Sequence, residues 1–172
     1  MAHLTGEERA RYVQLMFARI AGRYDLMNRL MTVGQDQRWR RYVIAQAALP
    51  PDGRLLDIAT GTGDIALEAL QQQPRLQAVG GDFVLEMMRA GQRQPARSAI
   101  QWTAADTLAL PFPNATFDAV TSGFLMRNVI DVPGALREQA RVTRPGGRVV
   151  ILESSPPKDN WLRPLIRFHL NT

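Results

Sequence analysis

Cysteine is absent from these 172 residues, and histidine nearly so, because the only two, His3 and His169, stand close to the chain ends. The first absence excludes disulfide bonds, thiolate catalysis and metal sites built on cysteine. The second means that a general base in the middle of the chain is expected to be something other than histidine. No metal site is expected.

Long apolar runs are missing too. None approaches the roughly 20 residues that a membrane-spanning helix needs, and no secretory signal peptide is visible. Hydrophobic content of 45% and charged content of 22% are ordinary for a globular protein. We therefore expect a cytoplasmic protein whose length suits a single domain.

Lysine is almost absent, so the formal charge of +5 comes from arginine, with Lys158 as the only lysine. Residues 9–41 hold eight arginines against Asp25 and Asp36, a local net charge of +6. Such a patch fits an anionic membrane surface or nucleic acid, and it fits solvated helix faces at least equally well. We expect no nucleic-acid partner, while peripheral contact with the inner face of the membrane stays an open alternative.

The stretch 54–66 organises the rest of the chain. A short apolar run ends near Asp57, a turn carries Gly61 and Gly63, and an apolar-periodic segment follows. This order predicts strand, tight loop and helix, with main-chain N–H groups at the helix start facing a ligand. Asp82 ends the next strand about twenty residues further on, the spacing expected of a ribose partner in a nucleotide-binding βαβ unit.

Asp57 bears on which cofactor the loop holds, since the glycine spacing also satisfies the dinucleotide pattern. A carboxylate beneath the loop would repel the pyrophosphate of NAD, whereas S-adenosylmethionine has an ammonium, a sulfonium and no phosphate. We therefore favour S-adenosylmethionine, with an NAD-dependent oxidoreductase as a rival. The alternative role for Asp57 is to cap the loop or the helix start.

Strand and helix patterns alternate through residues 54–153, which predicts an α/β fold with a doubly wound, mostly parallel sheet. Residues 1–50 show only helical patterns and are expected to cover the cofactor pocket, as part of the same domain as the core at 51–172. Asp106 falls in the loop after the third strand, where it is either an acceptor for an adenine amino group or a turn residue. The expected strands are residues 54–58, 77–81, 100–103, 119–122 and 148–152, and the expected helices include residues 35–49, 85–94 and one that starts at Asp131 and ends at 144–147.

Several segments, in order along the chain, resemble the ubiquinone/menaquinone-biosynthesis C-methyltransferases, a family of class I S-adenosylmethionine-dependent enzymes with a Rossmann-like core. Tyr-Asp-Leu-Met-Asn and Arg-Asn-Val are the most specific of them. The matching segments are residues 17–28 (FARIAGRYDLMN), 56–64 (LDIATGTGD), 81–83 (GDF), 110–118 (LPFPNATFD), 124–129 (FLMRNV) and 144–147 (RPGG).

The resemblance implies a cofactor contact at Thr62, a ribose contact at Asp82 and adenine contacts at Asp106 and Thr107. Gly123 stands where many members have a serine near the cofactor, and Leu125 where the family usually has glycine. From the loop pattern and the resemblance together, the expected cofactor-binding set is Asp57, Gly61, Thr62, Gly63, Asp82, Phe83, Asp106, Thr107 and Gly123.

The family's acceptor is a ring carbon of a reduced, polyprenylated quinone, so the resemblance implies a C-methyltransferase of quinone biosynthesis. Arg127 is expected to stabilise the phenolate-like oxygen, and Asp25 or Tyr24 to take the proton, directly or through water. Arg127 and Asn128 alternatively organise their loop. A class I methyltransferase acting on another small molecule, and a relative that binds the cofactor without turnover, are the other readings.

Family members continue past the fifth strand with further helices and an antiparallel strand pair that completes the sheet, whereas this chain stops at Thr172. We therefore expect an incomplete core whose last segment, around Trp161, begins the next helix. An uncovered fifth strand invites association through its edge, so a homo-oligomer is one expected state.

Overall fold

The computed structural model describes residues 6–154, in which five strands form one sheet in the order β3-β2-β1-β4-β5. Each neighbouring pair of strands is parallel. This is the doubly wound α/β arrangement that the sequence predicted. The strands are β1 (Arg54–Ile58), β2 (Gln77–Asp82), β3 (Gln101–Ala104), β4 (Phe117–Gly123) and β5 (Thr143–Leu152).

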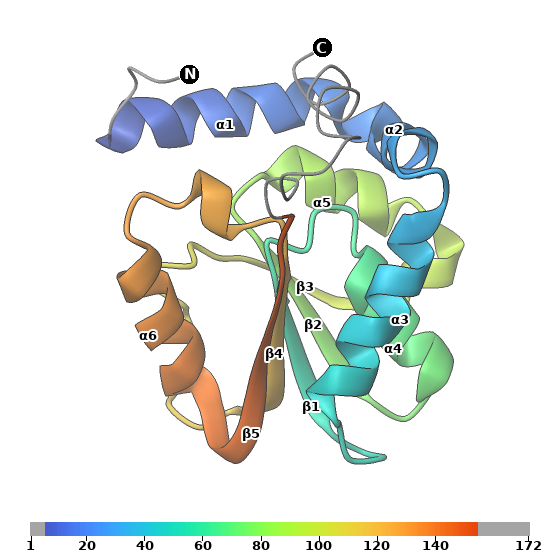
Figure 1. The fold of residues 1–172 in the computed structure, drawn as a ribbon, viewed down its shortest axis with the longest axis vertical. Helices are drawn as coiled ribbons and strands as arrows, with labels where there is room; N and C mark the ends of the chain where they lie inside the picture. Colours follow the sequence, from blue (N-terminus) through green and yellow to red (C-terminus); the bar gives the residue numbers. More distant parts are fainter. Residues whose placement is uncertain (1–5, 155–172) are drawn as a thin grey trace, which may run out of the picture.

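Helices cover both faces of the sheet and its upper edge (Figure 1). α3 and α4 lie on one face and α6 on the other, while α1 crosses above the carboxyl ends of the strands. The helices are α1 (Gly6–Ile20), α2 (Tyr24–Met31), α3 (Gln35–Ala47), α4 (Asp64–Gln72), α5 (Leu85–Gln92) and α6 (Val132–Val142), with single 3-10 turns η1 (Ala21–Arg23), η2 (Pro95–Arg97) and η3 (Met126–Asn128).

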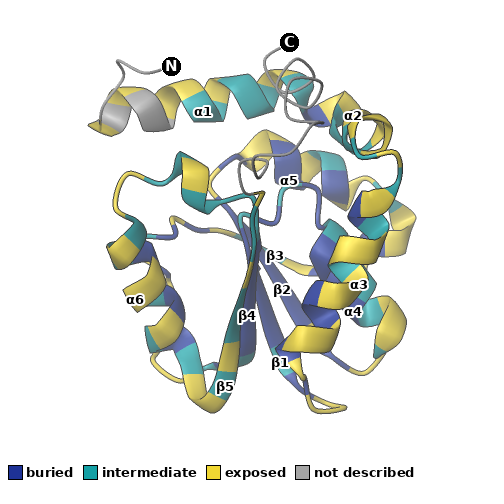
Figure 2. Ribbon diagram, in the orientation of Figure 1, coloured by how far each residue is buried: buried dark blue, intermediate teal, exposed yellow. Residues whose placement is uncertain are grey.

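Both faces of the central strand, β1, are buried, because its side chains alternate between the two faces of the sheet and helices cover each face. Leu55 packs in the cluster that contains Val43 of α3 and Ile65 of α4, whereas Leu56 packs with Phe117 and with α6. Both leucines are fully buried, which contributes about 1.5–3 kcal/mol each. In Figure 2, β1, β2 and β4 are mostly buried and stand out against the exposed outer faces of the helices, whereas β5 is intermediate to exposed.

The largest departure from the sequence prediction lies between α6 and β5. The segment 144–147 was expected to close the helix, but α6 ends at Val142 and β5 begins at Thr143. The register shifts between Phe117 and Ala119, so the Pro-Gly-Gly residues enter the strand as an irregularity. The start is as predicted, since Asp131 caps α6 by accepting from the N–H of Gly134.

Other boundaries move by a few residues. The helices expected at 35–49 and 85–94 end at Ala47 and Gln92, and β4 is longer than 119–122. The segment around Trp161 lies outside the described residues. The division into a cover and a core, and the expected lack of a terminal strand pair, stay predictions.

Candidate cofactor and acceptor site

The loop between β1 and α4 reverses the chain at the carboxyl edge of the sheet. Its φ angles are positive at Ala59 (55°), Gly61 (58°) and Gly63 (92°). A Cβ on Gly63 would lie 2.6 Å from the ring of Trp102, so side-chain volume as well as backbone angle requires glycine there. Gly61 lines a cavity at this edge, but its N–H donates to Asp82 and that of Gly63 to the Thr60 carbonyl, so the expectation that main-chain N–H groups here face a ligand stays a prediction.

Asp82 joins this loop to the end of β2. Its carboxylate accepts from the N–H of Gly61 at 2.6 Å and from the N–H of Val84 at 2.7 Å. Burial raises the pKa of Asp82, and the backbone hydrogen bonds act in the opposite direction. The side chain lines a cavity, as a ribose partner must.

Asp57 lies beneath the loop and does not line that cavity. It is 1% exposed, and its carboxylate accepts from the hydroxyls of Thr60 at 2.6 Å and Thr121 at 2.9 Å. Burial raises its pKa to about 7, although the hydrogen bonds, including one from the Ala66 N–H, lower it. Asp57 thus has the capping role that the sequence left as an alternative. The charge of Asp57 therefore discriminates between NAD and S-adenosylmethionine less strongly than we expected. The carboxylate is buried, accepts hydrogen bonds and is partly protonated near neutral pH.

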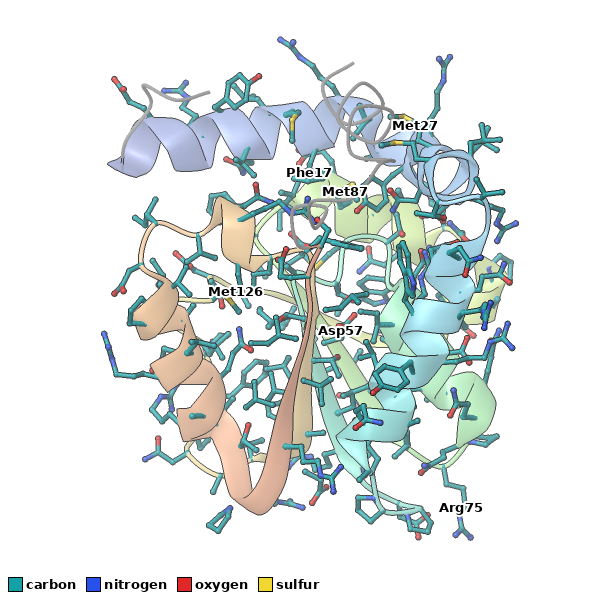
Figure 3. The ribbon with its side chains drawn as sticks, viewed as in Figure 1. Phe17, Met27, Asp57, Arg75, Met87 and Met126 are labelled. Atoms are coloured by element: carbon teal, nitrogen blue, oxygen red, sulfur yellow. The ribbon has the colours of Figure 1, made fainter. Side chains whose placement is uncertain are left out.

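The cavity opens between the carboxyl ends of the strands and α1. Phe17 of α1 packs with Met87 of α5 above it, as Figure 3 shows. Polar groups in the lining include those of Tyr24, Gly61, Asp82, Asp106, Thr107 and Asn128. The remaining lining is mostly apolar and includes Val13, Phe17, Phe83, Val84, Met87, Phe124, Leu125, Val129 and Ile130.

The predicted adenine residues lie in this lining. Asp106 is exposed and accepts from the N–H of Leu108 at 2.9 Å, so it also makes the turn that was its alternative role. Thr107 is buried, and its hydroxyl lies 3.5 Å from the Gln139 side chain. Gly123 lines the cavity too, and a Cβ there would stand 3.1 Å from Ile65.

Tyr24 is the one predicted acid–base residue that lines the cavity. Its ring meets Phe17 edge to face, with centroids 5.9 Å apart. Burial raises the pKa of Tyr24, against a hydrogen bond with Asn28. The phenol is therefore protonated at neutral pH and suits a hydrogen-bond donor better than a base.

Asp25 does not line the cavity, and its expected role as a proton acceptor, directly or through water, stays a prediction. Its carboxylate accepts from the Thr62 hydroxyl at 2.5 Å, from Gln94 at 3.1 Å and from Arg97 at 3.0 Å. Burial raises its pKa, but these hydrogen bonds and the Arg97 charge outweigh it and leave the pKa below its usual range. Thr62 likewise turns its side chain to Asp25 and does not line the cavity.

Arg127 lies next to the cavity without lining it. Its Cζ stands 4.9 Å from the centroid of Phe124, a lining residue, and its Nε is 3.4 Å from Glu153. Glu153 also accepts from the N–H of Met126. These contacts match the loop-organising alternative, while the neighbouring Asn128 does line the cavity.

Sequence reasoning missed two parts of the site. Arg97 is 4% exposed and donates to the Thr62 carbonyl at 2.6 Å, yet nothing in its local sequence marks it. Gly91 looked like an ordinary helical residue, but a Cβ there would overlap the same carbonyl oxygen. Both act on the glycine loop from segments distant in sequence.

Two features of residues 6–154 concern membrane spans and metal sites. No described helix is long and apolar enough to cross a membrane. Within the same residues, no group of three or more histidine and acidic side chains is placed to hold a metal ion.

Comparison with known proteins identifies relatives along almost the whole chain. The model of the ubiE/COQ5 methyltransferase family matches residues 4–168. The ubiquinone/menaquinone biosynthesis C-methyltransferase UbiE of Desulfotalea psychrophila is 50% identical over 91% of this chain and 64% of its own length. The demethylmenaquinone methyltransferase of Roseiflexus castenholzii is 49% identical over 94% of this chain and 66% of its own. The chain thus spans about two thirds of the length of these curated relatives.

Solved structures share the fold. The YcgJ protein of Bacillus subtilis is 30% identical with a TM-score of 0.60, and the match covers 74% of this chain and 55% of that one. A putative S-adenosyl-L-methionine-dependent methyltransferase of Methanococcus maripaludis has a TM-score of 0.67 at 22% identity, over 78% of this chain and 62% of that one. With the family model matching from residue 4 to residue 168, the chain belongs to the ubiE/COQ5 methyltransferase family.

Proposed function

We propose that the chain is an S-adenosylmethionine-dependent C-methyltransferase that methylates a ring carbon of a reduced polyprenyl quinone precursor. The observation that carries the proposal is the lining of one cavity. It combines Asp82 and the Gly61 turn, which suit a nucleoside, with the apolar side chains of α1 and of residues 124–130, which suit a prenylated ring. The names of the two curated relatives point to the same chemistry.

The lining residues have separate roles in binding the methyl donor. Asp82 accepts from the ribose hydroxyls, and Asp106 with Thr107 receives the adenine, so the methyl donor is held beside the glycine turn. The donor supplies an electrophilic methyl group on a sulfonium. The protein's contribution is to hold the acceptor carbon in line with it and to exclude water.

Charge develops on the acceptor oxygen as its ring carbon becomes nucleophilic. We assign the Tyr24 hydroxyl to that oxygen as a hydrogen-bond donor, because it lines the cavity and its raised pKa keeps it protonated. Arg127, whose guanidinium lies against the ring of the lining residue Phe124, adds positive charge at the cavity wall. Asp25 is not assigned the proton, since its carboxylate is committed to Thr62, Gln94 and Arg97. The acceptor hydroxyl gives its proton to solvent, and the ring carbon takes the methyl group as the sulfonium becomes the neutral thioether of the demethylated product. The hydrogen on that ring carbon then returns to the acceptor oxygen, which restores the quinol.

Mass spectrometry of a reaction with S-adenosylmethionine and a reduced demethylated quinone tests the function. A quinol one methylene heavier is the expected product. Methylation of a different small molecule alone would favour a class I methyltransferase of other specificity. Cofactor binding without product would favour a binding relative without turnover, and NAD binding in place of the methyl donor would overturn the proposal.

A membrane surface is the second partner that we propose, because a polyprenyl acceptor resides in lipid. The two acids of residues 9–41 are turned inward, Asp25 to Arg97 and Asp36 to Arg40. The exposed surface of that segment therefore has arginines and apolar side chains together, as interfacial helices do. Its exposed arginines are Arg11, Arg19, Arg23, Arg29, Arg38 and Arg41, and its exposed apolar residues include Tyr12, Leu15, Leu26, Met27, Leu30, Met31 and Val33.

Co-sedimentation with vesicles tests this surface. The chain should bind vesicles with anionic headgroups, bind neutral vesicles less, and lose binding as salt increases. Replacing Arg23 and Arg29 by Gln should weaken binding, whereas Arg75→Gln, at an exposed site in the connection from α4 to β2, should not. Equal binding by both variants would argue against this surface.

We also propose self-association through β5. Among residues 6–154, β5 pairs with β4 on one side and with no strand on the other. Unpaired strand edges of this kind recruit further strands. Light scattering over a concentration series should therefore show a mass that increases with concentration, and Ile151→Lys should reduce it. A constant monomer mass would contradict the proposal.

A further inference from the structure

A continuous series of ion pairs lies on the outer side of the glycine loop. Asp36 and Asp64 each lie 2.7 Å from Arg40, and Asp64 also pairs with Arg97. Arg97 completes the series by pairing with Asp25 at 3.0 Å. None of these five side chains lines the cavity. They join α2, α3, α4 and η2, which are four separate segments of the chain.

The Asp25–Arg97 pair holds one residue of the glycine loop at two points. Arg97 donates from Nη1 to the Thr62 carbonyl at 2.6 Å, and Asp25 accepts from the Thr62 hydroxyl at 2.5 Å. Thr62 stands between Gly61, which bonds Asp82, and Gly63, which begins α4. The position of the turn therefore depends on this pair, of which Arg97 is buried and Asp25 half-buried.

The same pair also fixes the cover. Tyr24 and Asp25 are consecutive residues at the start of α2, and the first lines the cavity while the second bonds the loop. A Cβ on Gly61 would stand 3.9 Å from Cε1 of Tyr24, so turn and cover are in near contact. Moving α2 away would leave Arg97, which is 4% exposed, without one of its two carboxylates. Leaving the buried Arg97 guanidinium without this carboxylate is unfavourable, although the Asp25 side chain itself is 32% exposed, so the docked arrangement is favoured when loop and cover are both in place.

We propose that Asp25 and Arg97 are positioning residues that couple the glycine loop to α2, so that a ligand bound at the loop also orders the cover above the acceptor part of the cavity. This inference rests on the proposed function, because the ligand is the methyl donor or its demethylated product. It assigns to Asp25 a role different from proton transfer. It also gives a reason for the burial of Arg97, which does not line the cavity that holds Asp82.

Hydrogen exchange of the 172-residue chain, with and without S-adenosylhomocysteine, measures the coupling directly. In the parent chain the ligand should slow exchange both in residues 59–64 and in α2. In Arg97→Met the loop should still be protected at saturating ligand while α2 is not. Calorimetry should show the dissociation constant raised by roughly 5- to 150-fold, the usual range of coupling between sites.

Two further variants make the test specific. Asp25→Asn keeps an acceptor for the Thr62 hydroxyl but removes the charge, so it should lose part of the α2 protection, and it carries the test if Arg97→Met does not fold. Arg75→Met removes an exposed pair with Asp52, whose side chains are 72% and 70% exposed, and should behave like the parent. A variant that is only less stable would exchange faster in both segments in the same ratio.

The outcomes separate the inference from the function. Absence of ligand binding by the parent chain would overturn the cofactor assignment and this inference with it. Binding that protects the loop alone in the parent would overturn the inference and leave the cofactor assignment standing. Unchanged α2 protection in both Asp25→Asn and Arg97→Met would show that the pair does not couple the two segments.

Discussion

The N–H of Gly61 donates to the Asp82 carboxylate at 2.6 Å, so the turn after β1 is bonded directly to the end of β2. Val84 and Phe83 also donate backbone hydrogen bonds to this acid. A carboxylate has about four acceptor positions, so room remains for a ribose hydroxyl. The residue proposed to bind the cofactor thus also shapes the turn that faces it.

Asp82→Ala should therefore have two effects. Loss of a charge-assisted hydrogen bond of about 1.5–3 kcal/mol should weaken S-adenosylhomocysteine binding tenfold or more in calorimetry. The fold should also lose stability, because the N–H groups of Gly61 and Val84 lose their acceptor, which the sequence alone did not lead us to expect. Asp82→Asn keeps one acceptor oxygen, so its affinity and its stability should lie between those of the parent chain and those of Asp82→Ala. An unchanged dissociation constant in Asp82→Ala would rule out the ribose role.

Asp57 should give the fold a pH dependence opposite to that of a salt-bridged acid. Because the pKa of Asp57 is about 7 in the fold and 3.8 for an ordinary aspartate, the folded state holds the extra proton between these two pH values. Stability from this group is then present at low pH and lost as pH increases toward 7. In urea unfolding, the free energy of unfolding of Asp57→Asn relative to the parent chain should increase by on the order of 2–3 kcal/mol from pH 5 to pH 8, at 1.36 kcal/mol per pKa unit.

The matched control is Asp52→Asn, at an exposed position, which should follow the parent chain at both pH values. A constant difference between Asp57→Asn and the parent across this range would show that Asp57 is ionised throughout.

Gly91 should be far less tolerant of alanine than its place in a helix suggests. A Cβ there would stand 2.6 Å from the Trp102 ring and overlap the Thr62 carbonyl. Gly91→Ala should cost about 1–3 kcal/mol through overpacking and weaken cofactor binding by displacing the loop. Gly22→Ala, where nothing lies within 4 Å of the new Cβ, should be neutral or slightly stabilising in thermal melts. Similar melts and affinities for both variants would contradict the assignment.

Arg127→Ala should cut turnover much more than cofactor affinity. Loss of a charge that stabilises the transition state commonly costs about 10²-fold or more in rate. Glu153→Gln is the informative companion, because it removes the partner of Arg127 and leaves the guanidinium. Turnover should persist in Glu153→Gln and fall in Arg127→Ala. If Arg127→Ala retains near-normal turnover, Arg127 only organises its loop.

The sequence was sufficient for the parts of the molecule that depend on neighbouring residues. The short apolar run that forms β1 and the glycines of the turn that follows it are both local patterns. The segment 144–147 misled because Pro-Gly-Gly usually ends an element, and only the ladder with β4 shows that the strand runs through it. Contacts between segments distant in sequence could not be predicted. Arg97 and Gly91 have their roles because they contact Thr62, which lies about thirty residues away in the chain.

The Asp25–Arg97 pair also has a consequence for biosynthesis. The two residues are 72 positions apart, so the acid is synthesised well before its partner. At about 5–20 residues per second, α2 waits several seconds before Arg97 has been added. During that interval the apolar and arginine-rich cover has no docking site, because Met87 and Val84, against which Phe17 packs, are also made later. The cover is therefore synthesised before its docking site and can reach its native position only after that site has been made, and the cavity is completed only when it does.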